Sequence, residues 1–464
     1  MLSIFSDRPS RRAMLQIGSL GAMNLAQKLT VAGTALADAD ATSVLTGKSV
    51  IFLFLHGGPS QIETFDPKMT APAEIRSVTG ELATAVPGIT FGGTFPGLAQ
   101  RLDRFSVVRS FTTGDGNHDI KPVVSKTSMG ASVGSVYSRV AGTNHPANGL
   151  PRNVSLFPQS VDPDCQPMVT QFGRFDSTGA LGNAYAPFIP GSGGPLQENM
   201  KLSLTAERLD NRRHLLTQLD LLKRQMDAGD LLNGVDRFRQ QAFDTIIGGA
   251  AEAFDLRHES PATIRRYDTK PLISPDQISR RWRNYNNYVD NVRTLGKLLL
   301  MSRRLVERGC GFVTVTTNFV WDMHADINNA TMDEGMRYMG RPLDHALSAF
   351  IDDLEERGLS NDVMLVCCGE MGRTPRINSK GGRDHWGGLA PLLIYGGGAQ
   401  RGAVIGQSTR DAGRPQSEPW TIANLLSTIF HTVFDVGQIR LQNNLPVDLI
   451  RLVTSHSPID GLLS

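Results

Sequence analysis

The chain has 464 residues, 47 of them basic and 45 acidic, so its formal net charge at pH 7 is +2. That balance creates no long-range field for holding a polyanion, which argues against nucleic acid as a partner. A hydrophobic content of 40% supplies a sizeable core, yet no stretch beyond the amino terminus approaches the roughly 20 apolar residues of a membrane span.

The amino terminus has the layout of a twin-arginine export signal. Ser10-Arg11-Arg12 precedes a mildly apolar stretch, which Gln27-Lys28 interrupts and Ala35-Leu36-Ala37 closes. A signal over residues 1–37 predicts a periplasmic or extracellular protein, whereas a disordered basic tail is the alternative. Residues 1–37 hold four basic residues and one acidic residue, so their removal changes the net charge to −1. Residues 38–464 are expected to form a single domain.

Short apolar runs predict the strands of a sheet. In chain order they are Ser49–Leu55, Ser106–Phe111, Gly311–Thr317, Val363–Cys368 and Pro391–Tyr395. Residues 143–200 are rich in Pro, Gly, Asn and Ser, which predicts a long surface excursion that covers a sheet edge and contains few helices.

Apolar residues at three- and four-residue spacing predict the helices. They are Leu202–Gly229, Gly234–Leu256, Gln277–Gly309, Leu343–Gly358 and, as the final helix, Pro419–Phe434. The first three form a helical insertion near residues 202–307. The strand–helix–strand order of the remainder favours parallel pairing with right-handed crossovers, and hence an α/β fold.

Acids and histidines follow four of the predicted strands. The groups are His56 with Asp66, His118 with Asp119, Asp322 with His324, and Glu370 with Asp384 and His385. Because the carboxyl ends of parallel strands line one crevice, these side chains are expected to converge. They suit Zn, Mn, Mg or Ca, and the arginines among them suit a phosphate, sulfate or carboxylate.

Two segments carry an acid and a histidine together. In Asp322-Met323-His324 both polar side chains point the same way if the backbone is extended, so they share an ion or form a loop-stabilising hydrogen bond. Asp384-His385 sits in a glycine-flanked loop, where it ligates directly or supports the ligands from behind. Trp321 and Trp386 flank these segments and offer apolar walls or faces for stacking sugars.

Hydroxyl groups near such a site are candidate nucleophiles, because a divalent cation can deprotonate them at neutral pH. Thr113 is the predicted nucleophile, and its neighbour Thr112 and Ser60 are the alternatives. A purely structural threonine is also possible. Arg373 and Arg383 are predicted to steady the anionic oxygens of the substrate.

Several segments resemble a known family. They are LFLHGGPSQIETFDPK, GFVTVTT with the later WDMH, LDHALSAFIDDLEERGLSNDVMLVCCGEMGRTPRI and GGRDHWGG. They are similar to twin-arginine-exported bacterial proteins known as the domain of unknown function 1501 family, across essentially the whole mature chain. The family is grouped with the alkaline phosphatase-like superfamily, which includes sulfatases. That resemblance implies an alkaline phosphatase-like sandwich, with a mostly parallel central sheet and helices on both faces.

The chain departs from the superfamily pattern at its metal ligands. His56 stands where the first strand usually ends in an Asp, the spaced pair is Asp322 and His324 with one residue between, and Glu370-Met371 replaces an Asp-His pair. His385 would stand for the last histidine. One metal, a different metal or no metal is compatible with these changes. No Cys-x-Pro-x-Arg signature occurs, so a formylglycine nucleophile is not expected.

The sequence therefore predicts an exported metal-dependent hydrolase of sulfate or phosphate esters, acting on a small-molecule or carbohydrate anion. The cofactor is a divalent ion such as Zn, Mn or Ca. Its predicted ligands are His56, Asp322, His324, Glu370, Asp384 and His385. The alternative is a non-catalytic binding or scaffold protein that retains the fold, an alternative that Glu370-Met371 favours.

Overall fold

The computed structural model describes residues 44–191 and 250–463. Contacts within the chain assign Val44–Ser464 to one compact unit. The predicted export signal, the predicted helix at 202–229 and the predicted helix at 234–256 up to residue 249 lie outside the described residues. No helix within the described residues is long and apolar enough to cross a membrane.

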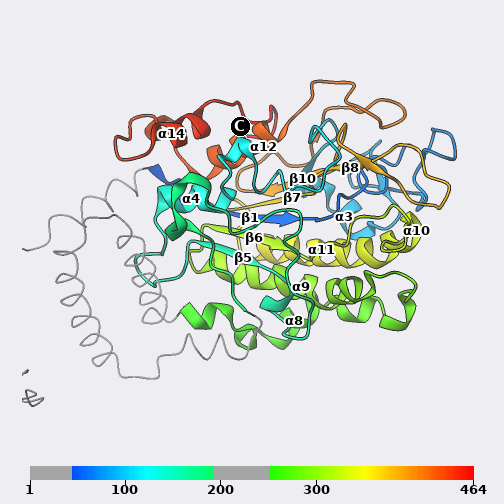
Figure 1. The fold of residues 1–464 in the computed structure, drawn as a ribbon, viewed down its shortest axis with the longest axis horizontal. Helices are drawn as coiled ribbons and strands as arrows, with labels where there is room; N and C mark the ends of the chain where they lie inside the picture. Colours follow the sequence, from blue (N-terminus) through cyan, green and yellow to red (C-terminus); the bar gives the residue numbers. More distant parts are fainter. Residues whose placement is uncertain (1–43, 192–249, 464) are drawn as a thin grey trace, which may run out of the picture. The chain divides into compact units, whose positions relative to one another are not determined.

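A seven-stranded sheet forms the centre, in the order β11-β4-β10-β7-β1-β6-β5 (Figure 1). The strands are β1 (Ser49–Phe54), β4 (Phe105–Val108), β5 (Asn153–Leu156), β6 (Phe312–Thr316), β7 (Val363–Cys368), β10 (Leu392–Gly396) and β11 (Val404–Ile405). β1 pairs in parallel with β6 and β7, β5 with β6, and β11 with β4. The prediction of a mostly parallel sheet is confirmed.

Two features of the sheet differ from the expectation of uniform crossovers. β10 runs antiparallel to both β4 and β7. No helix lies between β7 and β10, where the chain instead forms the short hairpin of β8 (Gly372–Arg373) and β9 (His385–Trp386), so nothing carries it back for parallel pairing. The excursion at 143–200 does not merely cover the edge, because β5 within it is the edge strand.

Nine α-helices are assigned within the described residues. They are α3 (Pro96–Ala99), α4 (Val133–Ala141), α8 (Pro261–Tyr267), α9 (Tyr285–Glu307), α10 (Met332–Gly335), α11 (Arg341–Glu356), α12 (Ile422–Val433), α13 (Val436–Ile439) and α14 (Val447–Thr454). The helix predicted from Gln277 starts only at Tyr285, because Pro275 opens a separate 3-10 turn. Pro419–Phe434 was predicted as the final helix, which is wrong, since α13 and α14 follow α12.

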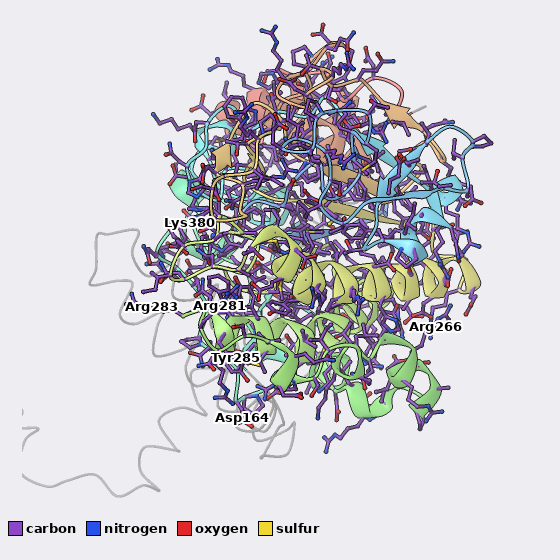
Figure 2. All side chains as sticks on the ribbon, turned by 90° about the vertical axis from the view of Figure 1, so that its right-hand side faces the viewer. Asp164, Arg266, Arg281, Arg283, Tyr285 and Lys380 are labelled. Carbon is purple, nitrogen blue, oxygen red and sulfur yellow. The ribbon has the colours of Figure 1, made fainter. Side chains whose placement is uncertain are left out.

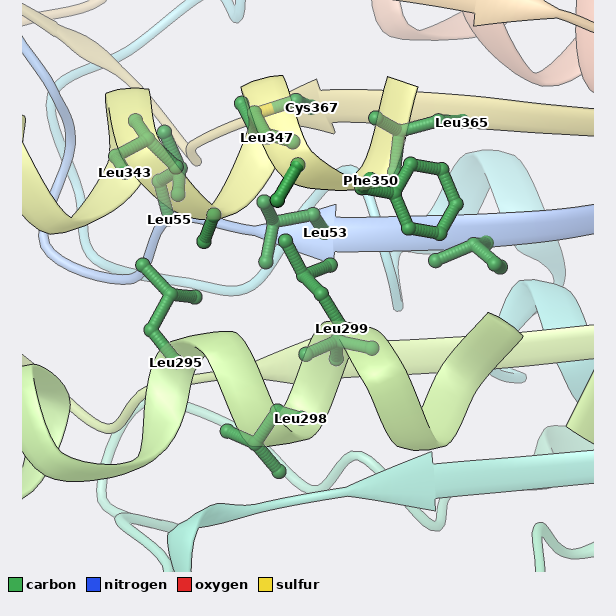
Figure 3. Close-up of a cluster of buried hydrophobic side chains, with 14 of the residues drawn as sticks. Leu53, Leu55, Leu295, Leu298, Leu299, Leu343, Leu347, Phe350, Leu365 and Cys367 are labelled. Atoms are coloured by element: carbon green, nitrogen blue, oxygen red, sulfur yellow. The ribbon is translucent and has the colours of Figure 1, made fainter. Parts of the chain in front are cut away.

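The sheet buries a core on each face, because successive strand side chains point to opposite sides. In β1, Ile51 and Leu53 join the core packed by α9 and α11, while Phe52 and Phe54 join the core packed by α4, α12 and α14. Figure 3 shows Leu53 of β1 between helices α9 and α11. Helices therefore cover both faces, as predicted.

The carboxyl ends of β1, β4, β6 and β7 lie at one edge of the sheet, because these strands share a direction. The segment between β8 and β9 and the segment before α9 lie beyond the strand arrows. In Figure 2, Lys380 of the first segment lies above Arg281 and Arg283 of the second segment and above Tyr285, the first residue of α9. This edge is where the sequence predicts a site.

Candidate metal centre

Loops after four strands and the β8–β9 hairpin supply the polar side chains of this edge. The contributors are His56 after β1, His118 after β4, Asp322 and His324 after β6, Glu370 after β7, and Arg373 and His385 in the hairpin. Residues from positions 56 to 385 thus lie close together. This convergence was predicted because the carboxyl ends of these strands lie at the same edge of the sheet.

The centre of the cluster is the trio His118, Asp322 and His385. His118 Nε2 lies 3.1 Å from His385 Nε2, which in turn lies 3.1 Å from Asp322 Oδ1. His118 Nε2 is 3.5 Å from the same Asp322 oxygen. Of the described residues, these three form the group whose ligand atoms all lie within 4.8 Å of one another. We call them the metal trio.

Glu370 fixes the orientation of His118. The Nδ1 atom of His118 lies 2.8 Å from Glu370 Oε1, and the Gly57 amide donates to the same carboxylate at 3.0 Å. An ionised carboxylate only accepts, so His118 carries its proton on Nδ1 when neutral and presents the lone pair of Nε2 to the trio. Burial lowers the pKa of His118, but hydrogen bonds to Asp322 and Glu370 outweigh this and raise it.

Asp322 is the hub of the cluster. Its Oδ1 accepts from Arg373 Nη2 at 2.7 Å, and its Oδ2 accepts from His324 Nε2 at 3.0 Å and from Asn329 Nδ2 at 2.9 Å. Burial favours the protonated acid, but the Arg373 charge and the histidine hydrogen bonds outweigh it and hold the pKa of Asp322 far below its usual range. The carboxylate is therefore ionised, as a metal ligand must be.

The two arginines predicted to bind the substrate are fully buried. Arg373 donates to the carbonyls of Gly57 and Gly58 as well as to Asp322. Arg383 donates to Glu63 Oε1 at 2.8 and 3.0 Å and to the carbonyl of Ile75. Both guanidinium groups are hydrogen-bonded to protein groups. Their role in this geometry is therefore structural, and they do not reach a ligand.

Four predicted ligands lie outside the metal trio, and one of them, Glu370, contacts His118 as described above. Both ring nitrogens of His56 are buried without a hydrogen-bond partner among the described residues, and burial lowers the pKa of His56 to about 4. The rings of Phe54, Phe172, Phe175 and Phe319 surround it at 5.0–6.0 Å.

Of the other two, His324 forms the hydrogen bond to Asp322 that was one of the two alternatives for that pair. Asp384 is exposed and accepts from Asn378 Nδ2 at 3.0 Å, so the structure does not bring it to the trio.

Thr113 lies beside the cluster with its hydroxyl uncommitted. Its side chain is 6% exposed, and its Oγ1 has no hydrogen-bond partner among the described residues. It lines a cavity of about 690 Å³ together with Lys121 and Phe172, and the Phe172 ring also contacts His118 at 4.9 Å. The hydroxyl of Ser60, the rival nucleophile, accepts from the amides of the following turn instead.

The two tryptophans have different environments. Trp321 is 1% exposed and so presents no face to a sugar. Trp386 is 37% exposed, donates from Nε1 to the Gly413 carbonyl at 2.6 Å, and lines a pocket of about 680 Å³ with Arg410 and Arg414. No residue of the metal trio lines this pocket, which Trp386 reaches from the same short strand, β9, that carries His385.

Sequence reasoning left two functional residues out of the ligand set. His118 was recognised at a strand end but not chosen as a ligand, although its position was the same signal that marked the others. Asn329 gave no signal, since an asparagine seven residues beyond Asp322 in an irregular loop is one of many.

Comparison with known families decides the classification. The family model described as "Protein of unknown function (DUF1501)" matches residues 47–443. The chain belongs to this family. No curated protein matches it. The predicted resemblance is thus confirmed, although the DUF1501 family carries no assigned activity.

Solved structures similar to this DUF1501 protein include three hydrolases or synthases. Phosphonate monoester hydrolase SpPMH from Silicibacter pomeroyi is 11% identical, with a TM-score of 0.34 over 89% of this chain and 78% of that one. The lipoteichoic acid synthase LtaP from Listeria monocytogenes is 7% identical, with a TM-score of 0.31 over 86% and 77%. A TAB5 alkaline phosphatase mutant with bound magnesium is 8% identical, with a TM-score of 0.25 over 76% and 92%. Similarity at this level says nothing about the activity of this chain.

Proposed function

We propose that this protein is an exported, metal-dependent hydrolase of phosphate or sulfate esters. The observation that carries the proposal is the metal trio, in which two imidazoles and one carboxylate converge while Glu370 orients His118 from behind. A histidine that is held by a carboxylate on its far nitrogen is the usual arrangement of a metal ligand.

The residues present fit one divalent ion. Two histidine nitrogens and one carboxylate oxygen are a common ligand set for catalytic zinc, and they leave positions open for substrate and water. Manganese or calcium would need further oxygen ligands. A bound ion would polarise the ester oxygen and favour deprotonation of a hydroxyl or water beside it.

The surrounding side chains support hydrolysis of an ester. The uncommitted hydroxyl of Thr113 is the candidate nucleophile. The rings of Phe172 and Phe319 contact the His118 ring at centroid distances of 4.9 and 4.7 Å and form an apolar wall that limits access of water. A low local dielectric strengthens the interactions of any charge that develops there.

The pocket at Trp386 supports a carbohydrate ester as substrate. The partly exposed indole of Trp386 is held in place by its hydrogen bond to the Gly413 carbonyl. Its ring offers an apolar surface on which a sugar ring can stack. Arg410 and Arg414 line the same pocket, and neither side chain forms a hydrogen bond or ion pair within the described part of the chain. Guanidinium groups suit sulfate and carboxylate on such a sugar.

A non-catalytic binding protein is the second candidate, and one observation favours it. Arg373, His324, His385 and Asn329 together saturate both oxygens of Asp322. That network is complete without an ion, so the fold does not require a metal to neutralise its buried charge.

The deciding experiment measures metal content. The protein would be expressed with its own export signal, purified from periplasm, and examined by elemental mass spectrometry. We expect close to one zinc, manganese or calcium per chain, lost in Asp322→Asn/His385→Ala and retained in the control His431→Ala on α12. Release of product from nitrophenyl phosphate or sulfate would then establish hydrolysis. A metal-free protein after reconstitution would favour the binding protein.

Export is tested separately. Replacing Arg11 and Arg12 by lysine weakens recognition of a twin-arginine signal, so we expect the precursor to accumulate in the cytoplasm while the unchanged chain reaches the periplasm. Equal export of both forms would contradict this route.

A further inference from the structure

The loop after β6, which carries Asp322, lies against the start of α9. The backbone amide of Arg283 donates to the carbonyl of Ile327 at 3.2 Å, and the backbone amide of Asn284 donates to the carbonyl of Asn328 at 3.1 Å. Main-chain hydrogen bonds therefore fix this loop to the helix, whatever the side chains beside them do.

Two side-chain amides connect the same helix to the metal trio. Asn284 Nδ2 donates to Asn329 Oδ1 at 2.6 Å, and Asn329 Nδ2 donates to Asp322 Oδ2 at 2.9 Å. Asn329 is only 3% exposed, so water does not compete for these bonds. We call Asn284 and Asn329 the amide relay, because together they link the start of α9 to the carboxylate of Asp322.

The charge of Asp322 fixes the direction of every bond in the amide relay. An ionised carboxylate only accepts, so Asn329 must turn its NH₂ group toward Asp322. The carbonyl oxygen of Asn329 then faces Asn284, whose side chain must donate. The carbonyl oxygen of Asn284 is left to accept from Asn287 Nδ2 at 3.4 Å. Turning either amide of the relay over would bring two acceptors into contact.

The position of Asn284 in α9 shows that its side chain does not serve the helix. Asn284 is the N-cap residue, where an asparagine side chain normally accepts from the amides of the first turn. It makes no such bond, because its amide is turned to Asn329 instead. Since the main chain already holds the loop, the distinct contribution of Asn284 is the orientation of the Asn329 amide.

We propose that Asn284 is a positioning residue of the metal trio, which acts through Asn329 on the carboxylate of Asp322. Because Asn329 binds Oδ2, the other oxygen, Oδ1, is the one that faces His118 and His385, at 3.5 and 3.1 Å. A ligand oxygen held in one direction binds an ion more tightly than one that rotates. That consequence for ion binding rests on the proposed function, whereas the orientation of Asp322 does not.

Reversing the donor at Asn284 tests the consequence for ion binding. In Asn284→Asp the new carboxylate cannot donate, so the Asn329 amide turns toward it and Asp322 loses a partner. We expect zinc affinity, measured by competition with a chelator, to fall about tenfold. The added negative charge alone would raise it. Asn286→Asp adds the same charge at an exposed position of the same helix turn and should not lower the affinity. Zinc affinity that is unchanged or higher in Asn284→Asp would overturn the proposal.

Thermal melts of the metal-free chain test the relay without an ion. The shift caused by Asn284→Asp is measured in the parent, in Asp322→Asn and in Asn329→Ala. We expect a loss of about 2 °C in the parent that disappears in both other backgrounds, because an amide at position 322 accepts either orientation and an alanine at 329 transmits none. Repulsion between charges would disappear only in Asp322→Asn, and a local contact only in Asn329→Ala. Either of these patterns, or an equal shift in all three, would overturn the proposal.

The two measurements separate this inference from the hydrolase proposal. A parent chain that binds no zinc would remove the hydrolase proposal, and the melts would then decide the relay. Should Asp322→Asn fail to fold with Arg373 unpaired, Asp322→Asn/Arg373→Met takes its place, because no unpaired charge remains. Zinc bound equally well by the parent and by Asn284→Asp would overturn the relay and leave the hydrolase proposal in place.

Discussion

Two buried carboxylates, each paired with a fully buried arginine, stand in contrast at this edge of the sheet. Glu63 pairs with Arg383 at 2.8 Å, and Asp322 pairs with Arg373 at 2.7 Å. Both ion pairs are buried, although Arg383 donates to Glu63 from two nitrogens and Arg373 donates to Asp322 from one. What differs is the rest of each carboxylate's surroundings.

The second oxygen of Glu63 accepts from Ser77 Oγ at 2.6 Å and from the Val78 amide at 3.1 Å. Among the described residues, the hydrogen-bond partners of this carboxylate are therefore one hydroxyl, one amide and one arginine. Asp322 shares its oxygens with imidazoles, which can exchange a proton for a metal ion. We call Glu63–Arg383 the closed pair, because no histidine contacts its carboxylate within the described residues and it stabilises the fold. We call Asp322–Arg373 with its histidines the open cluster, because the histidines could also bind a ligand.

The largest effect should come from breaking the closed pair. Arg383→Met leaves Glu63 buried without its countercharge, which should lower the free energy of unfolding by about 3–5 kcal/mol in a urea titration. Glu63→Gln/Arg383→Met should recover part of that loss, because no unpaired charge remains. Unchanged stability together with weaker binding of an anionic substrate would return Arg383 to the role that the sequence predicted.

A third buried carboxyl, that of Asp344, sharpens the comparison, because no arginine in the described part of the chain forms an ion pair with it. Burial raises the pKa of Asp344 to about 6, above the usual 3.8. A raised pKa means that the folded state binds the proton more tightly, so this contribution is complete below pH 3.8 and is lost as the pH rises through 6.

Asp344→Asn should remove that dependence. Between pH 4 and pH 7 we expect the difference in free energy of unfolding between variant and parent to change by on the order of 2–3 kcal/mol. Urea titrations at both pH values measure it, and Asp362→Asn, an exposed acid, is the control. A parallel pH profile for Asp344→Asn and the parent would contradict the assignment.

A smaller effect, on metal affinity, should follow from weakening the hydrogen bond between Glu370 and His118. Glu370→Gln keeps the size of the side chain but weakens its hold on His118, which should reduce metal affinity about 10- to 100-fold. Competition with a chelator measures the affinity. Asp384→Asn is the matched control, because that acid is exposed and its carboxylate, within the described residues, accepts only from Asn378. Equal losses in both variants would favour Asp384 as a ligand.

The smallest effect on stability is expected at Thr113. Thr113→Val replaces an unpartnered hydroxyl by a methyl group of the same shape, so unfolding free energy should change by less than about 1 kcal/mol. Hydrolytic activity, by contrast, should disappear. Thr112→Val serves as the control and should keep activity. Strong destabilisation of Thr113→Val would show that the hydroxyl is bonded and structural.

The fold was readable from the sequence where apolar runs were continuous. The predicted runs match β1, β6 and β7 closely, since strands buried on both faces are apolar throughout. β5 was missed because its four residues, NVSL, lie in a proline- and glycine-rich stretch without periodicity. α4 was missed because VGSVYSRVA combines a glycine with β-branched residues, and tertiary packing overrides that low helix propensity.

For the site, the sequence predicted its location at the carboxyl ends of the strands. It did not predict which groups each side chain contacts. Strand ends placed Asp322, Glu370 and His385 together, because that follows from parallel pairing alone. Whether Arg373 and Arg383 face a ligand or a carbonyl depends on how irregular loops fold back. No local pattern encodes this, and their full burial emerges only when the loops after β1, β6 and β7 close over them.

Arg373 joins backbone from three of these loops, since it sits in the hairpin after β7 and reaches the carbonyls of Gly57 and Gly58 and the side chain of Asp322. We therefore expect these loops to open together. In hydrogen exchange, the amide of Gly57, bonded to Glu370, and the amide of Trp321, bonded to the His56 carbonyl, should be released by one shared opening and report the same free energy of opening.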